Sequence, residues 1–168
     1  MTLGLMGLDT SLLLDAVLRL GLALLLTLPI ARERETHDVS AGLRTFPIVA
    51  VGACALILLS RAVLGPKSDS QTHVLQGLVT GVGFIGGGAI VKANDRVHGT
   101  ATAASIWATA VIGAAVGFGQ SEIALVLAFT TFVTLRAVCR FEERRSAAQS
   151  GAAAPGAQSS DIGRAASE

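Results

Sequence analysis

Residues 12–30 read LLLDAVLRLGLALLLTLPI, an apolar run that contains only two charged side chains. An α-helix rises about 1.5 Å per residue, so about 20 such residues cross a hydrocarbon core about 30 Å thick. Four more apolar stretches of similar length follow, separated by short polar loops, at residues 46–64, 74–92, 100–118 and 122–140. The sequence therefore predicts an all-α membrane protein, a bundle of about five transmembrane helices.

The overall composition agrees with this prediction. Hydrophobic residues make up 51% of the 168 residues and charged residues only 15%, against about 25% charged in soluble domains. The net charge of only +1 argues against binding to nucleic acid, which requires a strongly basic surface. From Ser146 the sequence is rich in Ala, Gly and Ser and cannot bury a core. We therefore expect a transmembrane domain over residues 1–145 and a disordered cytosolic tail over residues 146–168.

The basic residues are distributed unevenly between the two sides of the predicted spans. With the N-terminus outside, nine lie in the inner loops or at the C-terminal end: Arg32, Arg34, Arg44, Lys92, Arg96, Arg136, Arg140, Arg144 and Arg145. Only Arg61 and Lys67 lie in the outer loops. Because cytoplasmic loops carry an excess of Lys and Arg, we predict an external N-terminus and a cytoplasmic C-terminus.

Charged residues lie in and beside the first span. Asp15 and Arg19 share one helix face at i, i+4 spacing and can pair, either as an anchor at the outer surface or as part of a polar site open to the outside. The charged residues 32–35 are expected to form a solvated helix end. Asp15, Glu33 and Asp95 are weak candidate metal ligands, but they fall near opposite surfaces. The sequence therefore predicts neither a metal site nor a cofactor.

The third apolar stretch is unusually rich in glycine. Small residues four apart let membrane helices approach closely, so helix packing is predicted at glycines of the third and fourth spans: Gly77, Gly81, Gly83, Gly87, Gly113 and Gly117. We expect Trp107 to fill a gap that the third-span glycines leave. The pattern G-x-G-x-x-G at residues 81–86 lies inside an apolar run and lacks the acid that dinucleotide sites place about 20 residues later, which argues against nucleotide binding.

Two features near helix ends lead to local predictions. Pro29 should bend or end the first span, because proline cannot donate the helix hydrogen bond. Thr45 is placed to cap the second span, which has Pro47 near its first turn.

Several motifs, in their order along residues 12–140, resemble those of the MgtC/SapB family of bacterial inner-membrane proteins. They are Asp15 with Arg19, Glu33-Arg34-Glu35, Gly42-Leu43-Arg44-Thr45, the residues Gly81, Gly83, Phe84, Gly86 and Gly88, and Thr102-Ala103-Ala104-Ser105 with Trp107. The chain departs from the family pattern at Thr27 and Ala31, where Gly is usual, and at Phe46, where His is usual. Longer members carry a soluble C-terminal domain, and regulation through such a domain is not expected here.

The resemblance implies a multi-pass protein of the inner membrane, with its N-terminus in the periplasm. It also implies a link to magnesium limitation, acid stress or survival within hosts and, in some members, restraint of the F-type ATP synthase. We consider two functions. The first is a regulatory or interaction protein that acts through helix–helix contacts with itself or a membrane partner. The alternative is an oligomeric transporter or channel subunit for a cation such as Mg²⁺. An enzyme is not predicted, because no nucleophile–base pair or H-E-x-x-H spacing occurs.

Overall fold

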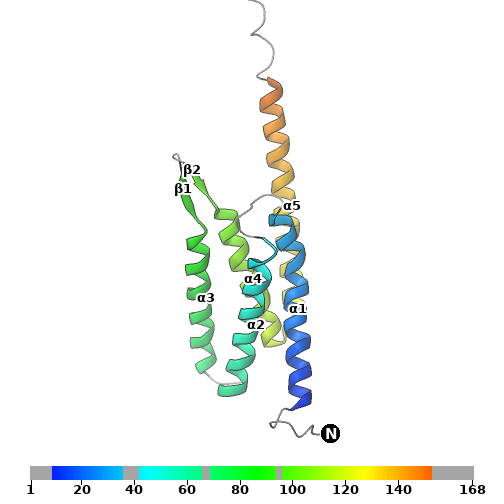
Figure 1. The fold of residues 1–168 in the computed structure, drawn as a ribbon, viewed down its shortest axis with the longest axis vertical. Helices are drawn as coiled ribbons and strands as arrows, with labels where there is room; N and C mark the ends of the chain where they lie inside the picture. Colours follow the sequence, from blue (N-terminus) through cyan, green and yellow to red (C-terminus); the bar gives the residue numbers. More distant parts are fainter. Residues whose placement is uncertain (1–8, 36–41, 66–68, 94–95, 153–168) are drawn as a thin grey trace, which may run out of the picture. The chain divides into compact units, whose positions relative to one another are not determined.

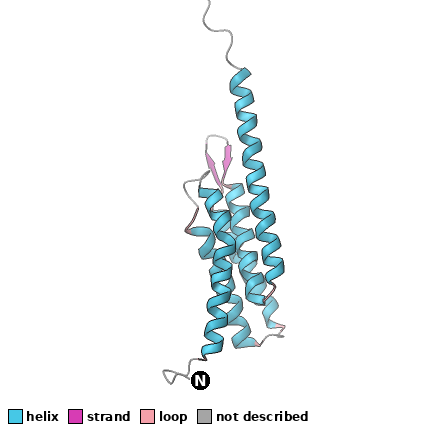
Figure 2. Cartoon of the chain, turned by 90° about the vertical axis from the view of Figure 1, so that its right-hand side faces the viewer, coloured by secondary structure: helices cyan, strands magenta, loops and turns pink. Residues whose placement is uncertain are grey.

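The computed structural model describes residues 9–35, 42–65, 69–93 and 96–152. Five helices follow one another along the chain (Figure 1): α1 (Thr10–Glu35), α2 (Thr45–Leu64), α3 (Ser70–Gly88), α4 (Thr100–Phe118) and α5 (Ser121–Ala152). A short hairpin of β1 (Val91–Ala93) and β2 (Arg96–His98) joins α3 to α4. It is the only strand pair in the described part of the chain (Figure 2). The predicted all-α class is confirmed.

The chain divides into two units, of which the first ends at Val133 and the second begins at Thr134. Within the first unit α4 is the central helix. More than half of its apolar window, 56%, is buried, against 11% for α1. Packing around α4 involves α1, α2 and α3. The core is therefore built around the fourth apolar stretch, whose predicted bounds, 100–118, coincide with those of the helix.

The closest helix contact is between α2 and α4, where glycines of α4 meet the backbone of α2. A Cβ atom on Gly113 would lie 2.0 Å from the carbonyl oxygen of Ala50, and one on Gly117 would lie 2.8 Å from Cβ of Ile57. Real Cβ atoms do not approach other atoms this closely, so only glycine fits at either position. This close approach replaces lipid with dense protein packing, which is the main source of helix association in a membrane.

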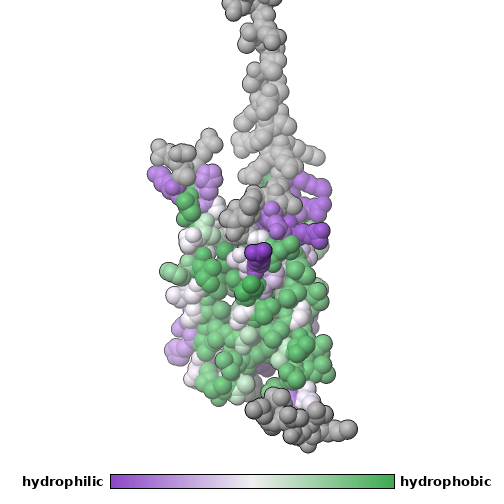
Figure 3. Space-filling model, viewed as in Figure 1, coloured by the Kyte–Doolittle hydropathy of each residue, from purple (hydrophilic) through white to green (hydrophobic). Residues whose placement is uncertain are grey.

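Apolar side chains cover much of the face of the first unit that Figure 3 shows. On α1 they include Leu14 and Leu18, and on α5 they include Val126 and Phe129, all more than half exposed. In water such a surface would aggregate, whereas in a bilayer it contacts lipid tails.

Among the described residues, four helices are long and apolar enough to cross a membrane: α1, α2, α4 and α5 over Ser121–Val138. The remaining helix, α3, has 19 residues, which corresponds to about 28 Å. It runs beside α2 and α4 (Figure 1). Its polar start and its glycines lower its hydropathy, so its crossing of the membrane stays a prediction.

The predicted end of the third span was wrong. The helix stops at Gly88, and Val91 already belongs to β1, although the apolar run continues to residue 91. Three successive glycines weaken the helix here. The hairpin then returns to α4 through Gly99, which has a φ of 85°. A Cβ atom on Gly99 would lie 1.9 Å from the carbonyl oxygen of Ala89, so both its backbone conformation and its surroundings exclude a side chain.

Three further predictions concern helix ends, and the one that places Thr45 as the cap of α2 was wrong. Thr45 is the first residue of α2, and Arg44, which makes no side-chain capping bond, occupies the capping position. Pro29 does not end α1, which continues to Glu35 and buries Ile30 and Ala31 beyond it. The alternative, that Pro29 bends the helix, stays a prediction. α5 continues to Ala152, past the predicted start of the tail at residue 146, and residues 153–168 lie outside the described part.

Candidate functional site

The end of the bundle that carries the hairpin holds a buried arginine. Arg34, in the last turn of α1, donates a hydrogen bond from Nη2 to Oγ1 of Thr102 in the first turn of α4, at 2.6 Å. Arg34 is 8% exposed and Thr102 1%. A guanidinium near the C-terminus of a helix also interacts favourably with the helix dipole. The prediction of a solvated helix end was therefore wrong for Arg34, which joins α1 to α4.

The sequence motifs on either side of Arg34 and Thr102 meet at this same end, called here the Arg34 end. A Cβ atom on Gly86 of α3 would lie 3.3 Å from the carbonyl oxygen of Ala103 on α4. Gly42, just before α2, is packed against Glu35, with 2.8 Å between a Cβ on the glycine and Cβ of Glu35. Segments far apart in the sequence are thus brought together, while Leu43, Arg44 and Ala104 are exposed at the surface.

Three hydroxyl groups buried in the bundle donate hydrogen bonds to carbonyl oxygens of their own helices. Ser105 donates to the carbonyl oxygen of Ala101 at 2.7 Å, and Thr109 donates to that of Ile106 at 2.9 Å. Thr27 of α1 does the same toward Ala23. These bonds remove the cost of burying a hydroxyl group in an apolar core. Ser105 and Thr109 are therefore assigned a structural role. Thr102 differs from them because its hydroxyl oxygen accepts a hydrogen bond from a side chain of another helix.

The opposite end of the bundle holds the predicted pair. Arg19 donates from Nε to both carboxylate oxygens of Asp15, at 2.9 and 2.8 Å, so the pairing is confirmed. Arg19 also donates from Nη1 to the carbonyl oxygen of Val116, 3.3 Å away on α4. The pair thus links α1 to the last turn of α4, and Asp15 stays on the exposed side.

A second arginine reaches the same turn of α4, and sequence reasoning missed it. Arg61 of α2 donates from Nη1 to the carbonyl oxygen of Gly117 at 3.2 Å. α4 ends in a Schellman motif, in which Gly119 has φ 82° and the amides of Gly119 and Gln120 bond back to Val116 and Ala115. An arginine near a helix end that closes on glycine was the available signal, because helix C-termini attract cations.

Just before α1, Asp9 caps the helix. Its carboxylate accepts bonds from the amide and the hydroxyl of Ser11, at 3.0 and 2.7 Å. These two bonds, the hydroxyl bond first, lower the pKa of Asp9 below its ordinary value. The sequence Asp-Thr-Ser before an apolar run carries this signal, since Asp is among the preferred N-cap residues.

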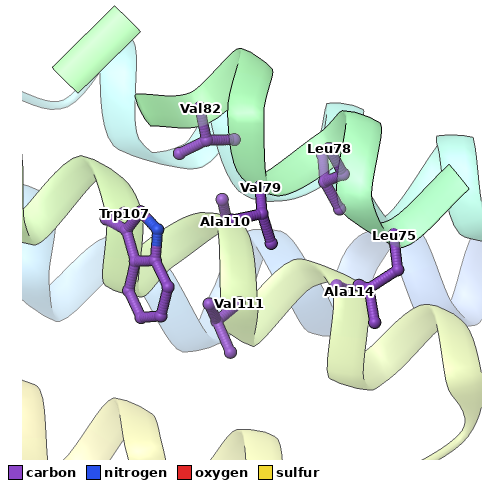
Figure 4. Close-up of a pocket in the computed structure, with 8 residues that line it drawn as sticks. All are labelled: Leu75, Leu78, Val79, Val82, Trp107, Ala110, Val111 and Ala114. Atoms are coloured by element: carbon purple, nitrogen blue, oxygen red, sulfur yellow. The ribbon is translucent and has the colours of Figure 1, made fainter. Parts of the chain in front are cut away.

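Between α3 and α4 lies a small apolar groove with a cavity volume of about 50 Å³. Its lining is drawn in Figure 4: Leu75, Leu78, Val79, Val82, Trp107, Ala110, Val111 and Ala114. Trp107 is 47% exposed. The expectation that it fills a gap beside the third-span glycines was wrong, because the α3 residues around it are Leu and Val. The groove follows from a large aromatic residue on a helix whose neighbouring positions are small.

Most glycines of α3 have no neighbour among the described residues. A Cβ atom on Gly77, Gly81, Gly83 or Gly87 would meet no atom within 4 Å. Phe84 on the same helix is 85% exposed. Of the glycines predicted to pack, Gly113 and Gly117 therefore lie against α2, and those of α3 lie at the surface. Whether that surface packs against another chain stays a prediction.

The weak candidate metal ligands are not brought together. Asp15 and Glu33 lie toward opposite ends of α1, about 27 Å apart along the helix axis. Asp95 lies outside the described residues. In the described part of the chain, no three His, Cys, Asp or Glu side chains are close enough to hold a metal ion. A cation site within one chain would need other ligands.

The apolar surface and the helix bundle define a multi-pass α-helical membrane protein. A model of the MgtC family matches residues 20–144, and the chain belongs to this family. Protein SrpB of Synechococcus elongatus is 34% identical over 136 residues, which cover 74% of this chain and 75% of SrpB.

Two further relatives are longer than the region they share with this chain. Protein MgtC of Salmonella typhimurium is 38% identical over 117 residues, 70% of this chain and 49% of MgtC. The putative magnesium transporter YhiD of Escherichia coli is 33% identical over 127 residues, 72% of this chain and 59% of YhiD. The chain therefore spans about half of MgtC and about three fifths of YhiD. No solved structure matches the chain.

Proposed function

We propose that this chain is an interaction protein of the bacterial inner membrane, which acts through helix–helix contacts with a second membrane chain. The observation that carries the proposal is the open α3 face, defined as Gly77, Gly81, Phe84 and Gly88. These residues follow one another at i, i+4, i+7 and i+11, so they share one side of the helix. The three glycines have no neighbour within 4 Å among the described residues, and Phe84 is 85% exposed.

The physical argument is the contrast between this face and the α2–α4 contact. At Gly113 the chain uses a glycine to bring two helix backbones together. The open α3 face has the same small residues, but no described helix of the chain lies against its glycines. Glycine gains little by facing lipid, and it costs helix stability relative to alanine. A partner helix against this face would recover dispersion contacts that lipid tails supply less well.

The setting and the orientation are part of the proposal. The names of the relatives MgtC and YhiD, the latter a putative magnesium transporter, support a role in magnesium limitation. The family resemblance suggests acid stress and intracellular survival as related conditions, and the F-type ATP synthase as one partner besides a second copy. The N-terminus is periplasmic and the Arg34 end is cytoplasmic, because Arg32, Arg34, Arg44 and Lys92 lie there.

Substituting Gly81 by leucine tests the proposal. The site is open, so the folded monomer should tolerate the larger side chain, while a partner helix should be pushed away. A photoreactive residue at position 84 should crosslink wild-type chains to a protein in native cell membranes. With Gly81→Leu the yield should fall roughly tenfold, which corresponds to about 1.4 kcal/mol of lost association. Gly21→Leu on α1, also an open glycine, is the matched control and should leave the yield unchanged.

Two results would contradict the proposal. One is an equal crosslinking yield from wild type and Gly81→Leu, and the other is lipid adducts alone from position 84. The alternative function, an oligomeric subunit of a cation transporter, is favoured by the name of YhiD, a putative magnesium transporter. A magnesium flux into dye-loaded liposomes that disappears in Asp15→Ala would favour it over the interaction proposal.

A further inference from the structure

Two arginines from different helices converge on the last turn of α4. Arg19 of α1 and Arg61 of α2 donate from Nη1 to the neighbouring carbonyl oxygens of Val116 and Gly117. A Cβ atom built on Gly119 would lie 3.0 Å from Nη1 of Arg19 and 3.9 Å from Nη1 of Arg61. The two guanidinium groups therefore both lie within 4 Å of the same point beside Gly119, a residue without a side chain. We call them the arginine pair.

Neighbouring acidic side chains of the same chain offset only part of the positive charge of the arginine pair. Asp15 binds Nε of Arg19, whereas Arg61 makes no ion pair with an acidic side chain among the described residues. The carbonyl groups at the end of α4 offset part of the charge and hold the two groups in place. Each guanidinium has five N–H donors, and these contacts engage only some of them. The other acidic residue on the adjoining turn, Glu122, is exposed.

The arginine pair lies at the depth of lipid headgroups if the helices cross the bilayer. α2 has 20 residues and α4 has 19, which corresponds to about 30 Å and about 28 Å, close to the thickness of the hydrocarbon core. Arg61 is in the last turn of α2, and its acceptor Gly117 is in the last turn of α4. Both ends therefore fall at the boundary between lipid tails and headgroups, where phosphate groups are concentrated.

We propose that the arginine pair binds the phosphate group of an anionic phospholipid. The planar fork of a guanidinium matches the oxygen atoms of a phosphate, and two such forks can hold one phosphate from both sides. Free inorganic phosphate has the same chemistry. The lipid is the favoured source because both guanidinium groups bind carbonyl oxygens at the end of α4, an apolar span. The bound lipid would seal α1 and α2 to α4 at this end of the bundle.

The test uses the purified full-length chain in a neutral detergent and native mass spectrometry. Both lipids carry a phosphate group, but the choline cation of phosphatidylcholine cancels its charge and is repelled by the arginine pair. Wild type should therefore retain phosphatidylglycerol roughly tenfold better than phosphatidylcholine. Arg61→Gln should remove this preference. Arg32→Gln, which alters an exposed arginine at the Arg34 end, is the matched control and should keep it. Inorganic phosphate at micromolar concentration should not displace the lipid.

A second measurement keeps the test decisive if Arg61→Gln fails to fold. In wild type, raising the salt concentration from about 0.1 M to about 1 M should weaken the retention of phosphatidylglycerol and leave that of phosphatidylcholine unchanged, because salt screens charge interactions. Equal retention of the two lipids, or a folded Arg61→Gln that keeps the preference, would overturn the proposal. Displacement by micromolar phosphate would overturn the lipid assignment.

Discussion

Replacing Gly113 by alanine is expected to lower the melting temperature of the purified chain sharply. The added Cβ would lie 2.0 Å from the carbonyl oxygen of Ala50, a rigid backbone atom, so α2 and α4 would have to move apart. Overpacking a core typically costs about 1–3 kcal/mol, and a clash with backbone belongs at the upper end, about 3 kcal/mol. Thermal unfolding in detergent, followed by helical circular dichroism, measures the effect.

The matched control for this prediction is Gly77→Ala on α3. Both changes add one methyl group to a helical glycine, but the Cβ at position 77 meets nothing within 4 Å. The control should melt within a few degrees of wild type. Equal melting temperatures for Gly113→Ala and wild type would contradict the close α2–α4 contact on which the bundle depends.

The second large effect on stability is expected from breaking the hydrogen bond between Arg34 and Thr102. Thr102→Val keeps the shape of the side chain but removes this acceptor from a buried guanidinium, which should cost about 2 kcal/mol. Arg34→Met removes the charge as well. Because either single change already breaks the bond between them, the double variant should be more stable than the sum of the single losses predicts. Denaturation of the four proteins in detergent measures this coupling.

Thr130→Val on α5 is the control for the threonine substitution. Thr130 is exposed and donates to its own helix at Val126, so this change should have little effect on stability. Strictly additive losses in Arg34→Met, Thr102→Val and the double variant would contradict a joint role of the two residues in fixing α1 to α4.

The apolar stretches were sufficient to predict the class of fold, because membrane-spanning length is a property of local sequence. The fourth span was predicted with its observed bounds from its apolar run, and the structure places Gly99 and Gly119 at its two ends. The pairing of Asp15 with Arg19 was also predictable, because residues four apart on one helix face each other. These features need no knowledge of which helices become neighbours.

Contacts between distant segments could not be predicted in the same way. From the sequence alone, a charged residue in a polar stretch is predicted to be exposed to solvent. Only the fold shows that Thr102 lies beside Arg34. The role of Arg61 likewise depends on which helix ends next to α2. The hairpin after α3 begins at Val91, the last residue of an apolar run whose composition also suits a helix, so its start was missed. The glycine pattern identified candidate contacts without showing that those of α4 are filled within the chain and those of α3 are open.

The most direct test of this account is to ask whether α3 crosses the membrane. With Cys54 and Cys139 replaced by alanine, Asp69→Cys and His98→Cys place single thiols at exposed positions just before α3 and in β2 after it. In intact spheroplasts a membrane-impermeant maleimide should label the Asp69→Cys chain. The His98→Cys chain should be labelled only after lysis. Labelling of both positions from the same side would contradict the five-helix bundle with its Arg34 end in the cytoplasm.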